Sequence, residues 1–207
     1  MSKLIVVSAP SGGGKTSLIK ALLEDFDEID ILLGISFTTR KPRSKEKNGQ
    51  SYYFISKEEF QKKIDEGDFL ESAEVFGNYY GTSKEWVSDK LHKGHDVMLE
   101  LDWQGALQVK KSYPEAITVF VLPPSIKELQ VRLKNRRQDS KETISKRISF
   151  AKEEIQKSNK FDVLILNNSF KDALNDLKQV VTEQGIAEER QEEASSVASK
   201  LLEDASI

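Results

Sequence analysis

The stretch LIVVSAPSGGGKT, residues 4–16, joins a short apolar run to a glycine-rich segment that ends in Lys-Thr. The β-branched residues of the run predict a buried strand over 4–8, and the apolar residues that follow predict a helix over 16–23. A glycine-rich loop between a strand and a helix can curl so that its N–H groups face phosphate oxygens, and the helix dipole attracts the same anion. The stretch therefore predicts a P-loop that binds a nucleoside triphosphate.

Each residue of this loop has an expected part in binding ATP. We expect Lys15 to bridge the β- and γ-phosphates and the Thr16 hydroxyl to bind Mg²⁺. The usual pattern begins with glycine where this chain has Ala9, so Gly12 and Gly14 are expected to supply the tight turns. A plain glycine turn with a solvated lysine is the alternative, which the register of strand, loop and helix disfavours. The expected ATP-binding residues here are Ala9, Pro10, Ser11, Gly12, Gly13, Gly14, Lys15 and Thr16.

The composition of the 207 residues limits the class of protein. The length suits one domain, or one core with inserted sub-domains. A net charge of −3 disfavours a nucleic-acid-binding protein, and the lack of cysteine excludes disulfides and thiolate zinc sites. The sequence contains no recognisable signal peptide and no apolar run that would span a membrane, so we expect a cytoplasmic protein.

Strand and helix patterns alternate along most of the chain, which predicts an α/β fold. In this fold a parallel sheet forms the P-loop core, with helices on both faces. Residues 35–81 break the rhythm, because strand-like YYFI and FLESAEVF surround a short helix near 58–64, and they predict an insertion with its own small mixed α+β sheet. The other expected strands are 96–101, 117–122 and 163–166, and the other expected helices are 85–93, 103–111 and 173–181, with charged helices filling 126–157.

The segment SFTTRKPRSKEKNGQSYYF, residues 36–54, is a candidate for a second phosphate site. Arg40 and Arg43 flank a proline that stiffens the loop, and guanidinium groups on a stiff loop suit bidentate capture of a phosphate. Tyr52 or Tyr53 could add a phenol donor. On composition alone a solvated basic loop is favoured, and the presence of a P-loop in the chain raises the weight of the phosphate site.

Four carboxylates, two within one predicted strand and two at the end of another, are candidates for ligand binding. Glu71 and Glu74 fall in an apolar strand pattern, so at least one is expected to face inward, where it needs hydrogen-bond donors. Guanine offers an adjacent pair of donors, N1–H and the N2 amino group, whereas adenine does not; an exposed strand face is an equal alternative for Glu71. Glu100 and Asp102 end a strand at its carboxyl edge, where a carboxylate can hold a water on Mg²⁺ or a ribose hydroxyl, or be solvated.

Five motifs, in their order and spacing, together resemble the guanylate kinase family, whose members phosphorylate GMP from ATP. The similarity runs from about residue 3 to residue 181, and the motifs are specific as a set although none is specific alone. They are SAPSGGGKTSL (8–18), SFTTRKPR (36–43), NGQSYYF (48–54), FLESAEVFGNYYGTS (69–83) and LDWQGA (101–106).

The resemblance implies transfer of the γ-phosphoryl group of ATP to GMP, and also to dGMP, in purine nucleotide metabolism, with Mg²⁺ as the cofactor. It implies that arginines and tyrosines bind the GMP phosphate, and that Glu71, helped by Ser36 and Thr82, reads the guanine edge. Glu100 stands where the family often has Asp. The implied GMP-binding residues are Ser36, Arg40, Arg43, Tyr52, Glu71, Tyr80, Thr82, Glu100 and Asp102.

The same resemblance implies how the chain is divided. A guanylate-kinase-like domain would cover 1–184, followed by a tail over 185–207. Within the domain, the core would be 1–35, 82–130 and 151–184, the GMP-binding insertion 36–81 and the lid about 131–150.

Lid arginines are implied to stabilise the charge that spreads over the transferred phosphoryl group as the lid closes. By motif position these are Arg136 and Arg147, which join Lys15 and Arg40 as the expected catalytic residues. Arg137 stands where the family commonly has Gly, which affects the expected flexibility of the lid.

Three further polar residues have expected roles. Arg132 lies four residues after Glu128 and is expected to pair with it rather than to act in catalysis. Asn167 matches an asparagine that the family places near adenine. Asn168 replaces a usual Asp, so an acidic contact is lost there.

The tail has apolar residues at helical spacing, including Ala194, Ala198 and Leu201, which predict an amphipathic helix. It could dock on its own core, join a partner chain or fray, and the apolar seam favours a homo-oligomer contact. Two other functions are weighed against GMP phosphorylation: another nucleoside monophosphate kinase, and an inactive guanylate-kinase-like binding module. Glu71 and SFTTRKPR argue against the first, and the intact Gly-Lys-Thr of the P-loop argues against the second.

Overall fold

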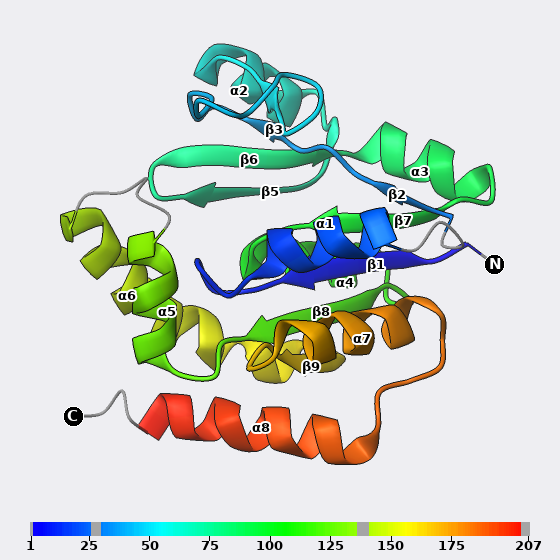
Figure 1. Cartoon of the computed structure of the whole chain (residues 1–207). Helices are drawn as coiled ribbons and strands as arrows, with labels where there is room; N and C mark the ends of the chain where they lie inside the picture. The colour runs from blue at the N-terminus through cyan, green and yellow to red at the C-terminus, as the bar shows by residue number, and fades with distance from the viewer. Residues whose placement is uncertain (1, 26–29, 136–140, 204–207) are drawn as a thin grey trace. The chain divides into compact units, whose positions relative to one another are not determined.

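The main sheet of the computed structural model has five strands in the order β2-β7-β1-β8-β9 (Figure 1). β2 pairs with β7 and β8 pairs with β9, and both pairs are parallel. Every residue of β1 is buried, as expected where a parallel sheet is covered by helices. The strands are β1 (Leu4–Ser8), β2 (Ile31–Leu33), β7 (Asp96–Glu100), β8 (Ile117–Leu122) and β9 (Val163–Leu166).

The structure describes residues 2–25, 30–135 and 141–203. The chain forms two compact units: unit 1 contains Met1–Val6 and Asp30–Ile117, and unit 2 contains Val7–Ile29 and Thr118–Ile207. The helices of unit 1 are α2 (Lys57–Asp65), α3 (Lys84–His92) and α4 (Trp103–Ser112). Those of unit 2 are α1 (Lys15–Asp25), α5 (Ile126–Asn135), α6 (Lys141–Gln156), the 3₁₀ turn η1 (Ser158–Lys160), α7 (Phe170–Val181) and α8 (Glu188–Glu203).

Unit 1 carries a second sheet with the strand order β4-β3-β6-β5. Its β5–β6 hairpin is antiparallel and turns at Phe76 and Gly77, whose φ angles of 50° and 78° suit the tight turn that the twist of a hairpin favours. The adjacent α2 begins with a capping box, in which Ser56 and Glu59 satisfy each other's backbone N–H groups. The strands of this sheet are β3 (Phe37–Thr38), β4 (Tyr53–Phe54), β5 (Phe69–Val75) and β6 (Asn78–Ser83).

The predicted fold class is confirmed: a parallel sheet is flanked by helices, and an inserted segment forms its own small sheet. Every predicted strand and helix has a counterpart, and the strands over 117–122 and 163–166 match residue for residue. The sequence patterns missed β2, β3 and β6. The first two are very short, and β6 reads NYYGTS, in which a glycine and three polar residues obscure the strand pattern. The division into core, insertion and lid stays a prediction.

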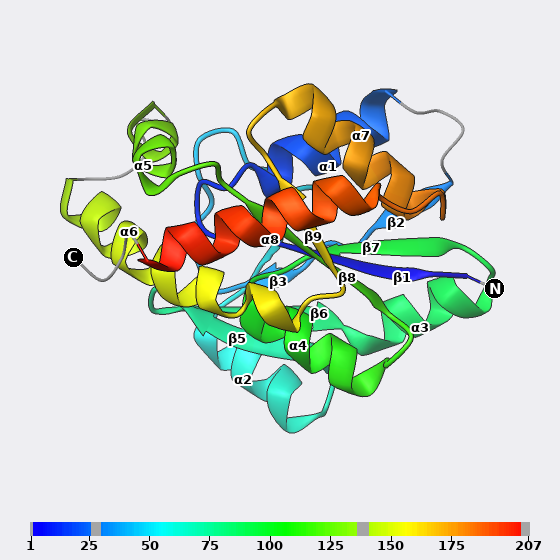
Figure 2. The ribbon, with the colours of Figure 1, turned by 90° about the horizontal axis from the view of Figure 1, so that it is seen from below.

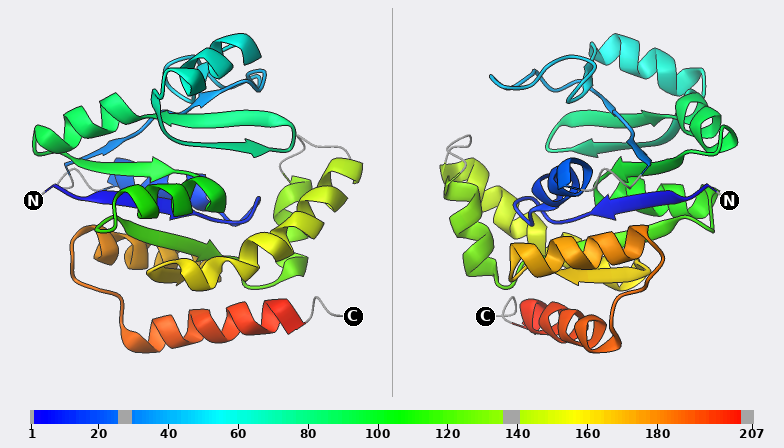
Figure 3. Two further views of the ribbon diagram at one scale, coloured as in Figure 1. Left: turned by 180° about the vertical axis from the view of Figure 1, so that it is seen from behind. Right: turned by 45° about the vertical axis from the view of Figure 1, so that its right-hand side comes forward.

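The predicted tail helix exists, and it docks on its own chain. α8 packs against β9 and α6 within unit 2, and the three views agree on this placement (Figures 2 and 3, red helix). The residues of its apolar seam that become buried are Ala194, Ala198 and Leu201. Because the seam is covered by the same chain, it no longer argues for a homo-oligomer contact. No helix among the described residues has the length and apolar character needed to cross a membrane.

The docked tail predicts a clear difference between two positions on α8. Leu201 is 3% exposed, so Leu201→Ala should lower the free energy of unfolding by about 2–5 kcal/mol through lost apolar contact and a cavity. Val197, one turn earlier, is only partly buried, so Val197→Ala should cost clearly less. Urea denaturation followed by circular dichroism measures both. Equal, small losses would mean that the tail frays in solution.

Candidate active site

The P-loop lies in unit 2 between β1 and α1, and its glycines explain its path. Gly12 and Gly14 have φ angles of +93° and +102°, which confirms that these two supply the tight turns. Gly13 is needed for another reason: a Cβ there would lie 3.0 Å from both the Ala9 Cβ and the Pro10 carbonyl oxygen. The Ala9 methyl group fits because Gly13, which faces it, has no side chain.

The Gly13 carbonyl is held from inside unit 2. The Asn167 Nδ2 donates to the Gly13 oxygen at 2.8 Å, and Asn167 is 3% exposed. Arg132 donates from Nη2 to the Asn167 carbonyl oxygen at 3.0 Å and from Nη1 to the Gly13 oxygen at 3.5 Å. The predicted pairing of Arg132 with Glu128 is confirmed, with Nε to Oε1 at 2.9 Å, but the contact with the loop was not predicted. The adenine contact of Asn167 stays a prediction.

Helix α6 contacts the other end of the loop. Arg147 Nη1 donates to the Ser11 Oγ at 3.0 Å, and the Ser11 backbone N–H donates to Glu154 Oε2 at 3.3 Å. The structure thus places Arg147 at the P-loop. The second lid arginine of the prediction, Arg136, lies outside the described residues, as does Arg137.

The first turn of α1 presents the remaining loop residues. Lys15 begins the helix and is partly exposed, and Thr16 is exposed. The loop residues Ala9–Thr16, together with Arg147 and Asn167, all belong to unit 2. The predicted ATP-binding residues that the structure describes therefore come from a single unit.

In unit 1, three predicted residues form a buried chain of hydrogen bonds. The Thr82 hydroxyl donates to Glu71 Oε1 at 2.7 Å and lies 3.1 Å from the Ser36 Oγ. Glu71 is 3% exposed and Thr82 is 1% exposed. Of the two carboxylates weighed for this strand, Glu71 faces inward and Glu74 is exposed.

The environment of Glu71 alters its protonation. Burial raises the pKa of Glu71 to about 7, although the hydrogen bond from Thr82 opposes this change, and the negative charge of Asp102 adds to it. Helix α4 leaves little room on the other side, because a Cβ on Gly105 would lie 2.5 Å from Glu71 Oε2. The carboxyl group is thus confined, with an unusually high affinity for a proton.

Two arginines and two tyrosines of the prediction also gather in unit 1. Arg40 forms a bidentate pair with Glu46 at 2.8 and 3.0 Å, and the Arg43 backbone N–H donates to Glu46 Oε2 at 2.8 Å. The Arg40 guanidinium lies 5.4 Å from the Tyr52 ring centroid, and the Tyr52 and Tyr80 rings are 5.8 Å apart. The basic loop is therefore folded around its own carboxylate and is not simply solvated.

The two neighbouring tyrosines have different surroundings. Tyr53 turns away and stacks on Phe37 with the ring centroids 4.8 Å apart, whereas Tyr52 joins Arg40. Burial, and next the negative charge of Glu100, raise the pKa of Tyr52, so its phenol keeps its proton. Tyr52 is thus available as a neutral donor.

Glu100 and Asp102 follow the prediction in position. Glu100 ends β7, and Asp102 is the N-cap of α4, where its Oδ1 accepts from the Gly105 N–H at 3.0 Å and its Oδ2 accepts from Gln104 Nε2 at 3.1 Å. Asp102 therefore has a structural role as a helix cap, and its carboxylate oxygens keep further lone pairs for a ligand.

Three residues that contact the site were not identified from the sequence: Glu46, Glu154 and Gly105. Glu46 could have been found, since it is the single acidic residue among the basic residues of KPRSKEK. Glu154 and Gly105 belong to helices whose charged or small residues have no distinctive spacing. Only the packing of α6 and α4 brings them to the loop and to Glu71.

Comparison with known proteins shows which family the chain belongs to. The family model described as guanylate kinase matches residues 1–184. The chain belongs to the guanylate kinase family. It is 52% identical over 185 residues to the guanylate kinase of Shewanella violacea, covering 89% of each chain, and 49% identical over 188 residues to that of Vibrio parahaemolyticus, covering 91% of each. The crystal structure of guanylate kinase from Anaplasma phagocytophilum matches with a TM-score of 0.74 and 30% identity, over 92% of this chain and 89% of that one.

The guanylate kinase resemblance of the sequence is thereby confirmed, and so is the prediction that the chain is an ATP-dependent enzyme that phosphorylates GMP. The two rival functions are not favoured, because the relatives that match across most of the chain are guanylate kinases. The roles of individual residues are not given by these matches and are taken up below.

The raised pKa of Glu71 predicts a pH-dependent stability. Its pKa is 4.5 in a model compound and about 7 in the fold, so the folded state holds the proton more tightly. This stabilisation is complete below pH 4.5 and is lost as the pH rises through 7. Relative to Glu71→Gln, the native protein should therefore lose roughly 1–3 kcal/mol of unfolding free energy between pH 4.5 and 8.

Denaturant titrations across this pH range, without nucleotide, measure the difference between the two proteins. Glu74→Gln is the matched control, because it changes an exposed carboxylate on the same strand. The control should differ from the native protein by the same amount at every pH. A constant difference for Glu71→Gln as well would contradict the assignment.

Proposed function

We propose that unit 1 binds GMP and unit 2 binds ATP, and that the γ-phosphoryl group of ATP passes to a GMP phosphate oxygen to give ADP and GDP. The observation that carries this proposal is the buried Glu71–Thr82–Ser36 chain, a carboxyl and two hydroxyl groups confined in the interior of unit 1. The proposed setting is purine nucleotide metabolism in the cytoplasm, with dGMP as a second acceptor.

Guanine recognition follows from the donors and acceptors of these three hydrogen-bonded side chains. Ionised Glu71 can accept from guanine N1–H and N2–H together, which adds two charge-assisted hydrogen bonds and favours the carboxylate form. Adenine has no such pair of donors and would leave the buried carboxylate unsatisfied. The Thr82 hydroxyl holds the carboxylate, and the Ser36 hydroxyl contacts that of Thr82. Both hydroxyls keep capacity for further contacts with the base.

The phosphate of GMP is proposed to bind where Arg40, Arg43, Tyr52 and Tyr80 gather. Hydrogen bonds from Arg40 and the Arg43 N–H lower the pKa of Glu46, although its partial burial opposes this effect. Glu46 therefore stays ionised and fixes the Arg40 guanidinium before substrate arrives, which reduces the entropy lost on binding. The neutral Tyr52 phenol adds a donor without repelling the anion.

ATP is proposed to bind through the loop N–H groups, Lys15 and Arg147. The glycine turns leave successive N–H groups able to face phosphate oxygens, and Lys15 neutralises charge on the β- and γ-phosphates. Arg147, which already contacts Ser11, and Arg136 of the lid stabilise the negative charge that spreads over the transferred group.

The chemistry of the transfer needs no strong general base. A GMP phosphate oxygen is already ionised at neutral pH, and it forms the new bond to the γ-phosphorus. The bond between this phosphorus and the oxygen bridging to the β-phosphate breaks, and the electron pair stays with ADP. The protein contributes position and charge rather than a covalent intermediate.

Mg²⁺ is proposed as the cofactor, carried by the ATP phosphates. When bound, it would neutralise charge on the β- and γ-phosphates. The Thr16 hydroxyl, exposed on the first turn of α1, suits a single protein ligand, and Glu100 or Asp102 would act through water. Among the residues that the structure describes, no group of three or more acidic, histidine or cysteine side chains could hold a metal ion. The ATP phosphates would therefore supply most of the ligands.

The acceptor nucleotide distinguishes this proposal from its rivals. Release of ADP from ATP and Mg²⁺ should be fast with GMP, measurable with dGMP and near background with AMP, UMP and CMP. Equal or faster turnover with AMP would contradict guanine recognition. Tight GMP binding without turnover of any acceptor would favour the binding-module alternative.

The carboxylate of Glu71 predicts a selective defect. Glu71→Gln replaces an acceptor by an amide that offers N–H groups to the guanine donors, so KM for GMP should rise about 10- to 100-fold while KM for ATP stays within about twofold. Steady-state kinetics with each substrate varied in turn gives both values. Glu74→Gln is again the control and should match the native enzyme; a parallel rise of both constants for Glu71→Gln would make Glu71 a folding residue.

A further inference from the structure

Helix α8 lies outside the residues that the family model matches. That match ends at residue 184, and α8 begins at Glu188. Its buried residues pack on β9 and α6, the strand that leads to Asn167 and the helix that carries Arg147 (Figure 2). α8 is therefore in contact with two elements that reach the P-loop.

Gln191 of α8 completes the edge of the main sheet. Among the strands of the described residues β9 is the last in the sheet order, so one side of it has no partner from those strands. The Gln191 Nε2 donates to the Leu164 carbonyl oxygen at 2.8 Å, and the Leu164 N–H donates to Gln191 Oε1 at 3.1 Å. One side chain thus makes the pair of hydrogen bonds that a neighbouring strand would make, which fixes α8 to β9.

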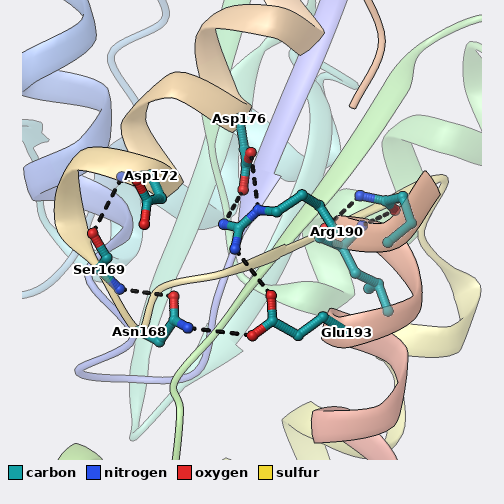
Figure 4. Close-up of polar contacts among 8 residues, drawn as sticks. Asn168, Ser169, Asp172, Asp176, Arg190 and Glu193 are labelled. Carbon is teal, nitrogen blue, oxygen red and sulfur yellow. Dashed lines mark hydrogen bonds and ion pairs between the residues drawn. The ribbon is translucent and has the colours of Figure 1, made fainter. Parts of the chain in front are cut away.

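Arg190 fixes α8 to α7 through a buried carboxylate (Figure 4). Its Nη2 lies 2.6 Å from Asp176 Oδ2 and its Nε lies 3.4 Å from Oδ1, while Nη1 lies 3.0 Å from Glu193 Oε2. Asp176 is 4% exposed and needs this cation. The hydrogen bonding that Arg190 donates to the Asp176 carboxylate is the main reason that the pKa of Arg190 is raised.

Glu193 extends this network to the corner between β9 and α7. Its Oε1 accepts from Asn168 Nδ2 at 3.4 Å, and Asn168 Oδ1 accepts from the N–H of Ser169, the N-cap of α7 (Figure 4). The preceding residue is Asn167, whose side chain holds the Gly13 carbonyl. A contact of α8 is therefore one residue away from the group that orients the P-loop.

The orientation of the Gly13 carbonyl matters for phosphate binding. In a planar trans peptide the carbonyl of one residue and the N–H of the next point in opposite directions. Asn167 draws the Gly13 oxygen inward, so the Gly14 N–H is directed away from Asn167. Displacement of Asn167 would rotate this peptide plane and misdirect a donor that the loop offers to ATP.

We propose that α8 positions the P-loop, with Arg190, Gln191 and Glu193 holding the β9–α7 corner so that Asn167 keeps the Gly13 carbonyl in place. These three are positioning residues, since they act through Asn167. The proposal rests on the proposed binding of ATP by unit 2. It predicts that damage to the α8 contacts weakens ATP binding selectively and leaves GMP binding intact.

The test compares Arg190→Met with Lys200→Met, which removes an exposed cation from the same helix. Isothermal titration calorimetry on the full chain measures Kd for ATP and for GMP separately, and steady-state kinetics measures both KM values. We expect Arg190→Met to raise Kd and KM for ATP roughly three- to tenfold, with the GMP values and all values of Lys200→Met unchanged. Unchanged ATP constants with a smaller active fraction would overturn the proposal and leave α8 a stabilising element only.

A second pair covers the case in which Arg190→Met fails to fold because Asp176 loses its cation. Glu193→Ala and Glu192→Ala truncate the same side chain at adjacent exposed positions, and only the first contacts Asn168. A rise of the ATP Kd in Glu193→Ala alone supports the proposal, and equal constants in both overturn it. If the native protein binds ATP but does not phosphorylate GMP, the proposed function fails, while the ATP Kd values of the variants still decide the role of α8. If the native protein does not bind ATP, the proposed function and the proposed role of α8 both fail.

Discussion

The carbonyl oxygen of Gly13 must find hydrogen-bond donors inside unit 2, and two side chains from different elements of that unit supply them. A buried backbone acceptor without a partner costs about 1–3 kcal/mol, and here Asn167 and Arg132 supply the donors. Asn167 follows directly after β9, and Arg132 lies on α5, so the strand and the helix are tied to the loop. The same requirement explains why polar side chains occupy this part of the interior.

Unit 1 depends on two carboxylates with opposite environments. Glu46 is surrounded by guanidinium and N–H donors and stays ionised, whereas burial favours the protonated form of Glu71. In the proposed function, an ionised Glu46 suits the task of fixing Arg40, the arginine proposed to bind the GMP phosphate. A Glu71 that is short of donors suits its proposed task of selecting a ligand that brings donors with it, because the missing hydrogen bonds become part of the binding energy.

In the role proposed for it, the tail helix α8 bears on the P-loop through its contacts with neighbouring elements. α8 protects the edge of the main sheet with a single glutamine and balances a buried aspartate with an arginine. Both contacts act on β9 and α7, the elements on either side of Asn167. The guanylate kinase fold thus gains a second layer of support from residues beyond the matched domain.

The sequence by itself determined the strand–loop–helix order of the P-loop, the need for glycine at Gly12 and Gly14, most of the regular elements and the family. These depend on local backbone freedom and on periodic patterns, which neighbouring residues specify. Only the tertiary structure decided that Glu71 is the buried carboxylate of β5. The pairing of β5 with β6 shifts register between Phe69 and Glu71, so two successive residues, Leu70 and Glu71, are buried and the two-residue period is interrupted.

The same distinction applies to the tail and to the arginines. An apolar seam with a period of 3.6 predicts a helix, but it does not say whether the same chain or another covers it. Likewise, KPRSKEK shows opposite charges, but it does not show that Glu46 joins both arginines. The sequence predicted the pairing of Arg132 with Glu128, but it did not predict the contact of Arg132 with the P-loop. These contacts join residues that are distant in the chain or are held together by a folded loop, so they depend on packing that no local pattern contains.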